Sequence, residues 1–268
     1  VMGFHWGVEG AAIATVTAQV CSGAICTAQL GKYGVWKIEK EDWKWDWELV
    51  KRLLALGLPV AFQNVIIGFG GIVIQYVING FGFLYVAGFT ATNKLYGLFE
   101  LAAVSFGYAT SSFVGQNLGA KQYDRVKKGV GFGIACSCIG AELVGLVCYL
   151  LAPKLIGFFN SEPVVIDFGV RHMRTICLFY FLLAFSHCIA GIMRGAGKAS
   201  VPMVTMLVFW CLVRVSYITI AVKLVNELET VSRAYPITWT CSSIVFLIYF
   251  LKADWIHNFD RLEAKSKA

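Results

Sequence analysis

Charged residues are scarce in this sequence. Only 15% of its 268 residues are charged, while 58% are hydrophobic and the mean hydropathy is +0.68. A soluble domain of this size needs more polar surface than such a composition supplies. The scarcity of charge therefore excludes an ordinary soluble domain and predicts a polytopic membrane protein. The net charge of +7 does not indicate nucleic-acid binding, because the basic residues lie in short segments between apolar runs.

The signatures of enzymes and metal sites are also lacking. The nine cysteines lie within or beside apolar segments, and Cys136 and Cys138 are one residue apart, which is not the usual spacing of metal ligands. The glycine-rich segment 195–200 resembles a phosphate loop, but Ile192 occupies the position of the first glycine. The four histidines are widely scattered: His5, His172, His187 and His257. We therefore expect no metal site, no cofactor and no enzymatic activity.

Apolar segments of membrane-spanning length recur along the chain. They cover residues 9–30, 56–79, 86–113, 130–152, 170–193, 203–223 and 231–251. These segments predict an all-α polytopic membrane protein with about seven transmembrane helices. The chain begins at Val1, with no initiator methionine and no signal-peptide pattern, so we expect a fragment of a longer protein.

The longest polar segment, residues 31–52, separates the first span from the others. Trp43, Trp47 and Val50 recur there at helical spacing among basic residues. This pattern predicts an amphipathic helix at the membrane interface, with a solvated linker as the alternative.

The basic residues predict the orientation in the membrane. Sixteen of the 23 Lys and Arg residues fall in segments 31–52, 114–128, 194–200 and 252–268, and four fall in the alternate segments. Loops rich in Lys and Arg stay in the cytoplasm. We therefore expect these four segments, including the C-terminus, on the cytoplasmic side.

Polar residues inside the third span form one stripe. Asn93, Tyr96, Glu100, Gly107 and Ser111 follow helical spacing, so they share a face that we expect to point to a protein interior or an aqueous cavity. Glu100 is our main candidate for a coupling-ion or cationic-substrate site, with Gly107 and Ser111 leaving room for a ligand. The full set of candidate binding residues is Glu100, Asn93, Tyr96, Asn64, Gln75, Tyr180 and His187.

The charged residues inside the spans need partners. A charge in the hydrocarbon region costs about 2.5 kcal/mol or more, so each should form a pair or face water. The candidates for such pairing are Glu142, Arg214, Arg174 and Lys94. An ion pair between Glu142 and Arg214 that locks two helices is one possibility. A pair between Glu100 and Arg214 or Arg174 would also be structural, so a transport role and a structural role for Glu100 both stay open.

Several motifs carry a resemblance to a known family. They are GLP followed by QN at residues 57–64, SFG at 105–107, FVGQNLGA at 113–120, GIMRGAGK at 191–198 with VPM at 201–203, and GVEGAAIAT at 7–15. Taken in this order and spacing, they resemble the MATE (multidrug and toxic compound extrusion) family of cation-coupled efflux transporters.

The resemblance implies a domain organisation. Family members have two six-helix lobes with substrate bound between them, so this chain would supply the last helix of the first lobe and all of the second. The implied parts are the truncated N-terminal lobe (1–30), a cytoplasmic amphipathic linker (31–52), the six-helix C-terminal lobe (53–251) and a cytoplasmic tail (252–268). The helix at 9–30 is then expected to pack peripherally or to detach.

The resemblance also implies a function. The full-length protein would be an antiporter in the plasma (cell inner) membrane, exporting amphipathic organic cations, drugs or metabolites in exchange for H⁺ or Na⁺ by alternating access. Its partners would be a small organic substrate, membrane lipid and the missing N-terminal lobe. The alternatives are a flippase for lipid-linked precursors, a seven-span receptor and a non-functional half-transporter.

Overall fold

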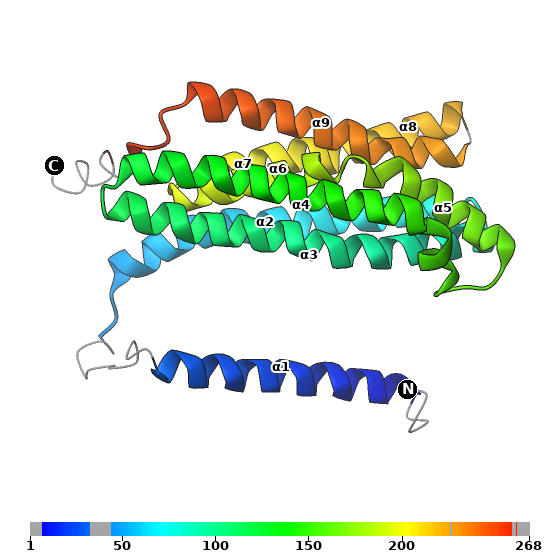
Figure 1. The fold of residues 1–268 in the computed structure, drawn as a ribbon, viewed down its shortest axis with the longest axis horizontal. Helices are drawn as coiled ribbons and strands as arrows, with labels where there is room; N and C mark the ends of the chain where they lie inside the picture. The colour runs from blue at the N-terminus through cyan, green and yellow to red at the C-terminus, as the bar shows by residue number, and fades with distance from the viewer. Residues whose placement is uncertain (1–6, 33–43, 226, 259–260, 262–268) are drawn as a thin grey trace. The chain divides into compact units, whose positions relative to one another are not determined.

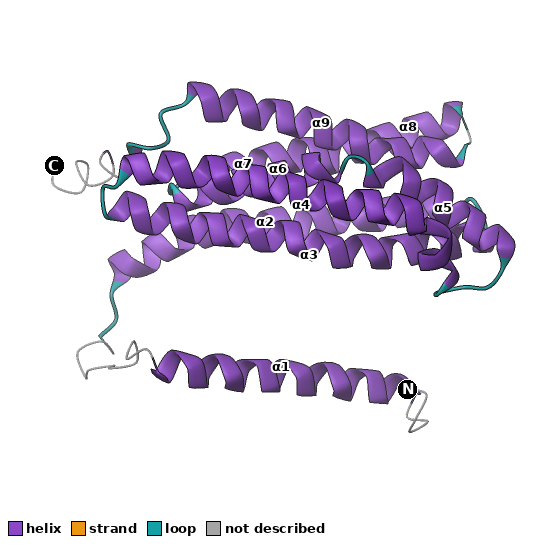
Figure 2. Cartoon of the chain, viewed as in Figure 1, coloured by secondary structure: helices purple, strands orange, loops and turns teal. Residues whose placement is uncertain are grey.

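The computed structural model describes residues 7–32, 44–225, 227–258 and 261. Over these ranges it is helical and contains no strand, which confirms the all-α class (Figures 1 and 2). The helices are α1 (Gly7–Lys32), α2 (Trp47–Asn79), α3 (Phe83–Gly119), α4 (Tyr123–Gly157), α5 (Pro163–Cys177), α6 (Tyr180–Gly195), α7 (Ser200–Met206), α8 (Arg214–Leu224) and α9 (Leu228–Lys252). A π-helical segment, Leu207–Val213, joins α7 to α8.

The chain divides into two compact units, Val1–Lys51 and Arg52–Ala268. Helix α1 belongs to the first unit, and the apolar side chains of Ile13, Val16 and Val20 are exposed there. The second unit holds the packed helices, which we call the lobe. Whether α1 packs at the periphery of a larger assembly stays a prediction.

Helix α2 begins earlier than the sequence patterns indicate. The carboxylate of Asp46 accepts hydrogen bonds from the backbone N–H groups of Glu48 (2.8 Å) and Leu49 (3.1 Å), which is the contact of a helix N-cap. Trp47 and Val50 therefore lie in the first turns of α2 rather than in a separate interfacial helix. The earlier part of that expected helix, residues 33–43, lies outside the described residues.

The lobe is built around the contact between α3 and α6. A Cβ atom placed on Gly191 would lie 2.1 Å from the carbonyl oxygen of Gly107, and one on Gly195 would lie 2.4 Å from that of Ser111. These glycines let the two backbones touch, as small residues do between membrane helices. Helices α4 and α5 pack beside this pair, and α9 packs against α5 and α6.

The fifth predicted span is broken in the middle. Helices α5 and α6 meet at an angle of 53°, with Leu178 and Phe179 between them. The break frees N–H groups at the start of α6, and the carboxylate of Glu142 accepts one of them, from Phe181, at 3.4 Å. Neither proline nor glycine marks the break, so the sequence patterns predicted one continuous helix.

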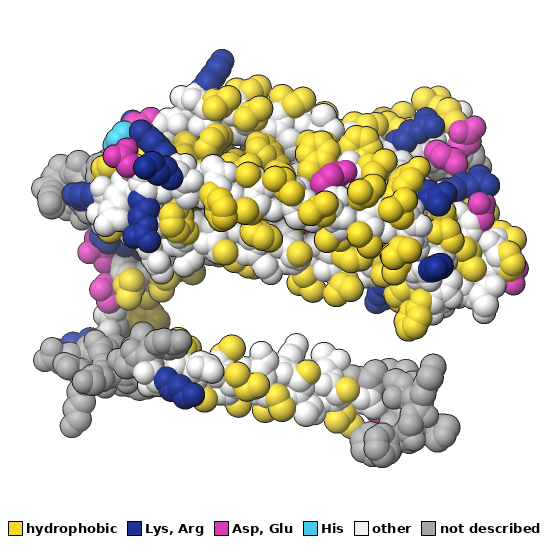
Figure 3. All heavy atoms as spheres, in the orientation of Figure 1, with side chains coloured by type: hydrophobic (Ala, Val, Ile, Leu, Met, Phe, Trp, Pro, Cys, Tyr) yellow, Lys and Arg dark blue, Asp and Glu magenta, His cyan; other side chains and the backbone are white. Residues whose placement is uncertain are grey.

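The apolar surface agrees with a multi-pass membrane protein. Among the described residues, five helices are long and apolar enough to cross a membrane, or six if the bent pair α5–α6 is one span. Helix α3 has 37 residues but is not among them, and it contains the polar residues Asn93, Lys94 and Glu100. The predicted number of about seven includes α3. Figure 3 shows hydrophobic side chains along the side of the lobe, with Lys and Arg gathered at its ends.

Candidate functional site

The polar stripe of α3 divides into two parts in the structure. The backbone of α6 lies directly against Gly107 and Ser111. The space beside these two residues is therefore filled, contrary to our expectation that it would admit a ligand. Asn93, Tyr96 and Glu100 are each partly buried on the same helix. Any site on this face must therefore lie in the half that contains Glu100.

Glu100 has partners on two helices. Its Oε1 atom accepts a hydrogen bond from the hydroxyl of Tyr96, four residues earlier on α3, at 3.1 Å. The same oxygen lies 3.7 Å from Nε2 of His187 on α6, which is close enough for an ion pair when the imidazole is protonated but too long for a hydrogen bond. The side chains are 31% and 12% exposed for Glu100 and His187, respectively. The structure thus brings together three of the predicted residues.

Aromatic rings cover this group from α9. Tyr96 is stacked on Trp239 with ring centres 6.0 Å apart, and Tyr235 lies edge-on to Tyr96 at 6.2 Å. Tyr180, another predicted site residue, lies 6.2 Å from the ring of Tyr96. The sequence analysis missed Tyr235 and Trp239, although their spacing of four residues on an apolar helix was a usable signal.

Arg214 has partners other than the expected carboxylates. Its Nε and Nη2 atoms donate to the hydroxyl of Thr238 on α9 at 3.1 and 2.8 Å. The guanidinium lies over the rings of Tyr235 (4.5 Å) and Trp210 (5.6 Å), where cation–π attraction partly replaces water. Trp210 also lies 5.3 Å from the ring of His187, so this charge borders the Glu100 group.

The other charged residues lie apart. Glu142 caps α6, as described above, and does not meet Arg214 among the described ion pairs. Arg174 donates to the backbone carbonyl of Tyr149 at 3.3 Å, and Lys94 is exposed on α3. The structure therefore does not form the ion pairs that we considered from the sequence.

The two candidates on α2 are not part of the group. Asn64 and Gln75 are exposed, and the amide of Gln75 donates to the Asn79 side chain at 2.9 Å within the same helix. Their neighbour Gln63 is buried instead and contacts the Met206 sulfur at 2.8 Å. We named Asn64 and Gln75 with Glu100 as candidate binding residues, but the described contacts do not join either of them to it.

The lobe and its site define a class of protein. A carboxylate, a phenol and an imidazole that converge from two helices inside an apolar bundle are typical of a membrane transporter, because such charges are costly in lipid. Within the described residues there is no cluster of three or more metal-ligating side chains.

Comparison with known proteins places the chain within that class. The family model described as MatE matches residues 59–220, so the chain belongs to the MATE family of multidrug efflux transporters, which are not enzymes. This confirms the family that the sequence motifs indicated.

Curated relatives and solved structures agree with this membership. The chain is 27% identical over 215 residues to the probable multidrug resistance protein YpnP of Bacillus subtilis, covering 78% of this chain and 47% of that protein. It is 26% identical to the probable multidrug resistance protein NorM of Thermotoga maritima, covering 76% and 44%. A crystal structure of MATE in the straight conformation superimposes with a TM-score of 0.81 over 98% of this chain and 58% of that one, at 20% identity. The chain thus spans about half the length of the curated relatives it matches.

Proposed function

We propose that this chain is the C-terminal part of a cation-coupled antiporter that exports amphipathic organic cations, drugs or metabolites. The relatives named as multidrug resistance proteins support a small organic substrate. In this proposal residues 1–30 are the last helix of an N-terminal lobe, 31–52 join the lobes, 53–251 form the second lobe and 252–268 are a tail. Substrate would bind between the two lobes, as alternating access requires.

One observation supports a coupling role for Glu100: its carboxylate lies between Tyr96 and His187, on two helices in backbone contact. A cation that neutralises Glu100 would remove its attraction for a protonated His187, while the hydroxyl of Tyr96 could still bond to the neutral acid. The charge of one side chain would thereby change the interaction between α3 and α6. Coupling consists of this kind of difference between two states.

Of the two possible coupling ions, we favour H⁺. Hard cations prefer oxygen ligands, and the described contacts of Glu100 offer one further oxygen, that of Tyr96, beside an imidazole nitrogen. An imidazole is, in contrast, the side chain that changes its charge most readily near neutral pH, and here it lies beside the carboxylate of Glu100.

We also propose that the protein resides in the plasma (cell inner) membrane with its C-terminus in the cytoplasm. The excess of Lys and Arg in segments 31–52, 114–128, 194–200 and 252–268 supports this orientation. A single cysteine at Gln122, on a cysteine-free background, should resist an impermeant reagent in intact cells. Labelling of this cysteine in intact cells would show that the orientation is opposite to the one proposed.

The coupling role can be tested with Glu100→Gln in the full transporter that the proposal implies. The variant keeps the size and a hydrogen-bond acceptor but cannot carry the charge, so we expect ethidium efflux to fall at least ten-fold and to lose its dependence on a pH gradient. The matched control is Glu142→Gln, which changes a carboxylate of the same lobe that caps α6. We expect it to lower stability while keeping the pH dependence of efflux. Wild-type efflux with unchanged pH and Na⁺ dependence in a folded Glu100→Gln variant would exclude the coupling role.

A further inference from the structure

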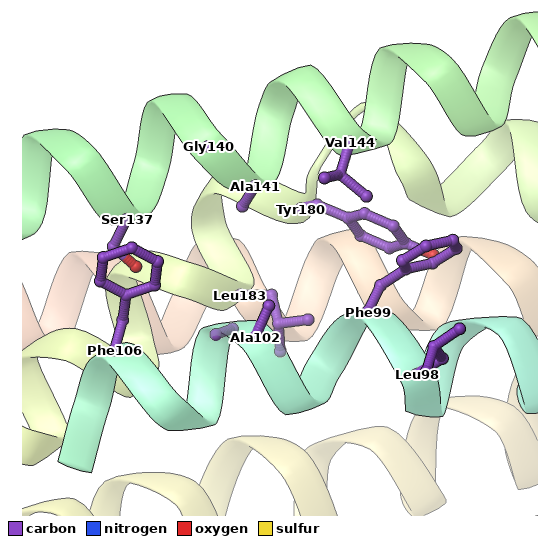
Figure 4. A pocket seen from close by; sticks show the side chains of 11 residues that line it. Leu98, Phe99, Ala102, Phe106, Ser137, Gly140, Ala141, Val144, Tyr180 and Leu183 are labelled. Carbon is purple, nitrogen blue, oxygen red and sulfur yellow. The ribbon is translucent and has the colours of Figure 1, made fainter. Parts of the chain in front are cut away.

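A separate pocket of about 290 Å³ lies between α3, α4 and the start of α6 (Figure 4). Its space comes from small lining residues, because Ala102 on α3 and Gly140 and Ala141 on α4 have little or no side chain to fill the gap. An apolar cavity of about 150 Å³ admits benzene, so this one has room for a molecule of about two rings. Glu100 and His187 do not line it.

Two buried hydroxyl groups in the pocket lack partners. Ser137 and Tyr180 line it, each is only 2% exposed, and neither hydroxyl has a hydrogen-bond partner among the described residues. Other hydroxyls in the lobe, such as those of Thr92, Thr110 and Thr238, donate to the carbonyl four residues earlier in their own helix. A buried hydroxyl without a partner costs about 1–3 kcal/mol. The pocket wall therefore includes two hydroxyl side chains whose oxygens are closed to solvent, and a bound molecule could satisfy either one that turned toward it.

The remaining lining residues define the ligand chemistry. All of them are apolar or small, and none is charged, so a charged ligand would lose its hydration without compensation. Figure 4 shows Ser137 and Phe106 at one end of the pocket and Tyr180 and Phe99 at the other, and the rings of Phe99 and Tyr180 have centres 6.3 Å apart. Both ends of the pocket thus combine an aromatic ring with a hydroxyl-bearing side chain, which favours a flat aromatic ligand with a polar group at its edge.

We propose that this pocket binds a small, uncharged aromatic alcohol of about two rings, which hydrogen-bonds to Ser137 or Tyr180. The rim is open toward the side of the lobe, where Leu98 and Phe106 are 61% and 41% exposed, so the ligand enters from the bilayer. The proposal is independent of the coupling role of Glu100. The pocket and the Glu100 site nevertheless share a neighbour, because the ring of Tyr180 lines the pocket and also packs against Tyr96.

The probe for this site is 2-naphthol, with naphthalene as the matched compound that lacks the hydroxyl. Binding of both is measured at pH 7 to the whole chain in lipid nanodiscs, with empty nanodiscs subtracted. We expect saturable binding of 2-naphthol that is about five-fold tighter than that of naphthalene, which is the effect of one hydrogen bond. Equal binding of the two compounds, or no saturable binding at all, would mean that lipid chains or water fill the pocket, and the proposal would be wrong.

Two sets of variants locate the binding. A Cβ on Gly140, which lines the pocket, would meet no described atom within 4 Å, so Gly140→Leu should take up space in the pocket and weaken 2-naphthol binding at least ten-fold. The control is Gly131→Leu, the same change at another open position of α4, which should bind as the wild type does. Unchanged binding in a folded Gly140→Leu would refute the site.

Removing both hydroxyls gives an independent test. The double variant Ser137→Ala, Tyr180→Phe breaks no internal hydrogen bond among the described residues, so it should be at least as stable as the wild type in thermal unfolding. It should bind naphthalene normally and lose the preference for 2-naphthol. A preference that persists in this variant would show that the hydroxyls do not recognise the ligand, whatever the outcome for Gly140→Leu.

Discussion

Helices α6 and α2 both contain glycines but pack in opposite ways. In α6, Gly191 and Gly195 lie so close to the backbone of α3 that a Cβ atom would collide with its carbonyl oxygens. In α2, a Cβ on Gly57, Gly68 or Gly71 would meet no described atom within 4 Å. Only a narrow stripe of α2 is buried: Gln63, Gly70, Ile74 and Ile78.

The difference shows that glycine spacing in a sequence does not by itself identify a helix contact. The α3–α6 pair is fixed by backbone contact, and this contact also sets the separation of Glu100 from His187. Helix α2 touches the π-helical segment through side chains, including the Cys211 thiol, which donates to the Ile66 carbonyl at 3.6 Å. We therefore expect α3 and α6 to move as one unit and α2 to have more freedom.

The largest effect should come from adding one methyl group at the α3–α6 contact. Gly191→Ala would place a Cβ 2.1 Å from the Gly107 carbonyl oxygen, so the helices must separate. We expect a loss of about 3 kcal/mol in stability, measured as the free energy or midpoint of unfolding in detergent. The matched change on α2, Gly71→Ala, should be neutral or stabilising by about 0.5–1 kcal/mol. Equal effects of the two changes would remove the distinction between the helices.

A smaller effect is expected where a buried cation joins α8 to α9. Arg214→Lys keeps the charge but loses the two N–H donors to Thr238 and the flat contact with Tyr235, so stability should fall by about 2 kcal/mol. The same change at the exposed Arg174 should cost less than about 0.5 kcal/mol. Thermal unfolding of the two variants under identical conditions makes the comparison. A cost at Arg174 that matches the cost at Arg214 would contradict it.

A still smaller effect is expected on α2. Gln63 is 4% exposed, and its side-chain oxygen has no partner among the described residues. Gln63→Leu removes this unsatisfied group together with the contact to Met206, so unfolding should be unchanged or about 1 kcal/mol more costly. Ile78→Ala, at a fully buried position of the same stripe, should destabilise by about 2–4 kcal/mol. If Gln63→Leu destabilises as much as Ile78→Ala, then α2 is held by polar contacts and not by its apolar stripe.

The smallest effect should lie beyond the membrane helices, in the segment after α9. The Asp254 carboxylate accepts hydrogen bonds from Nδ1 of His257 (2.8 Å) and from its backbone N–H (3.4 Å), and the hydrogen bond from His257 lowers the pKa of Asp254. Because the folded pKa lies below the unfolded value of about 3.9, this contribution is present above about pH 4 and is lost as the pH falls through the folded pKa.

Hydrogen exchange of residues 253–258 measures this effect. Asp254→Asn should speed exchange at pH 7 and have a smaller effect near pH 3, after correction for the intrinsic rates. Asn258→Ala, which removes a pH-independent hydrogen bond of 2.8 Å to the Ala196 carbonyl, should speed exchange at both pH values. An Asp254→Asn effect that is the same at pH 3 and pH 7 would show that the carboxylate charge does not hold this segment.

The sequence alone predicted the membrane spans, the family and one contact of the candidate site. Apolar runs predict spans because a backbone in lipid must satisfy its own hydrogen bonds, and the Tyr96–Glu100 contact follows from a spacing of four residues on one helix. Both are local properties. They depend on residues close together in the chain.

Only the tertiary structure decided which helix faces meet. His187 reaches Glu100 because α6 starts after a break at Leu178 and Phe179 and then crosses α3 at Gly107. The same geometry turns Asn64 and Gln75 to an exposed face of α2 and gives Arg214 a hydroxyl partner instead of a carboxylate. The rotation of a helix about its axis is set by packing against distant segments, and one helix's periodicity leaves that rotation open.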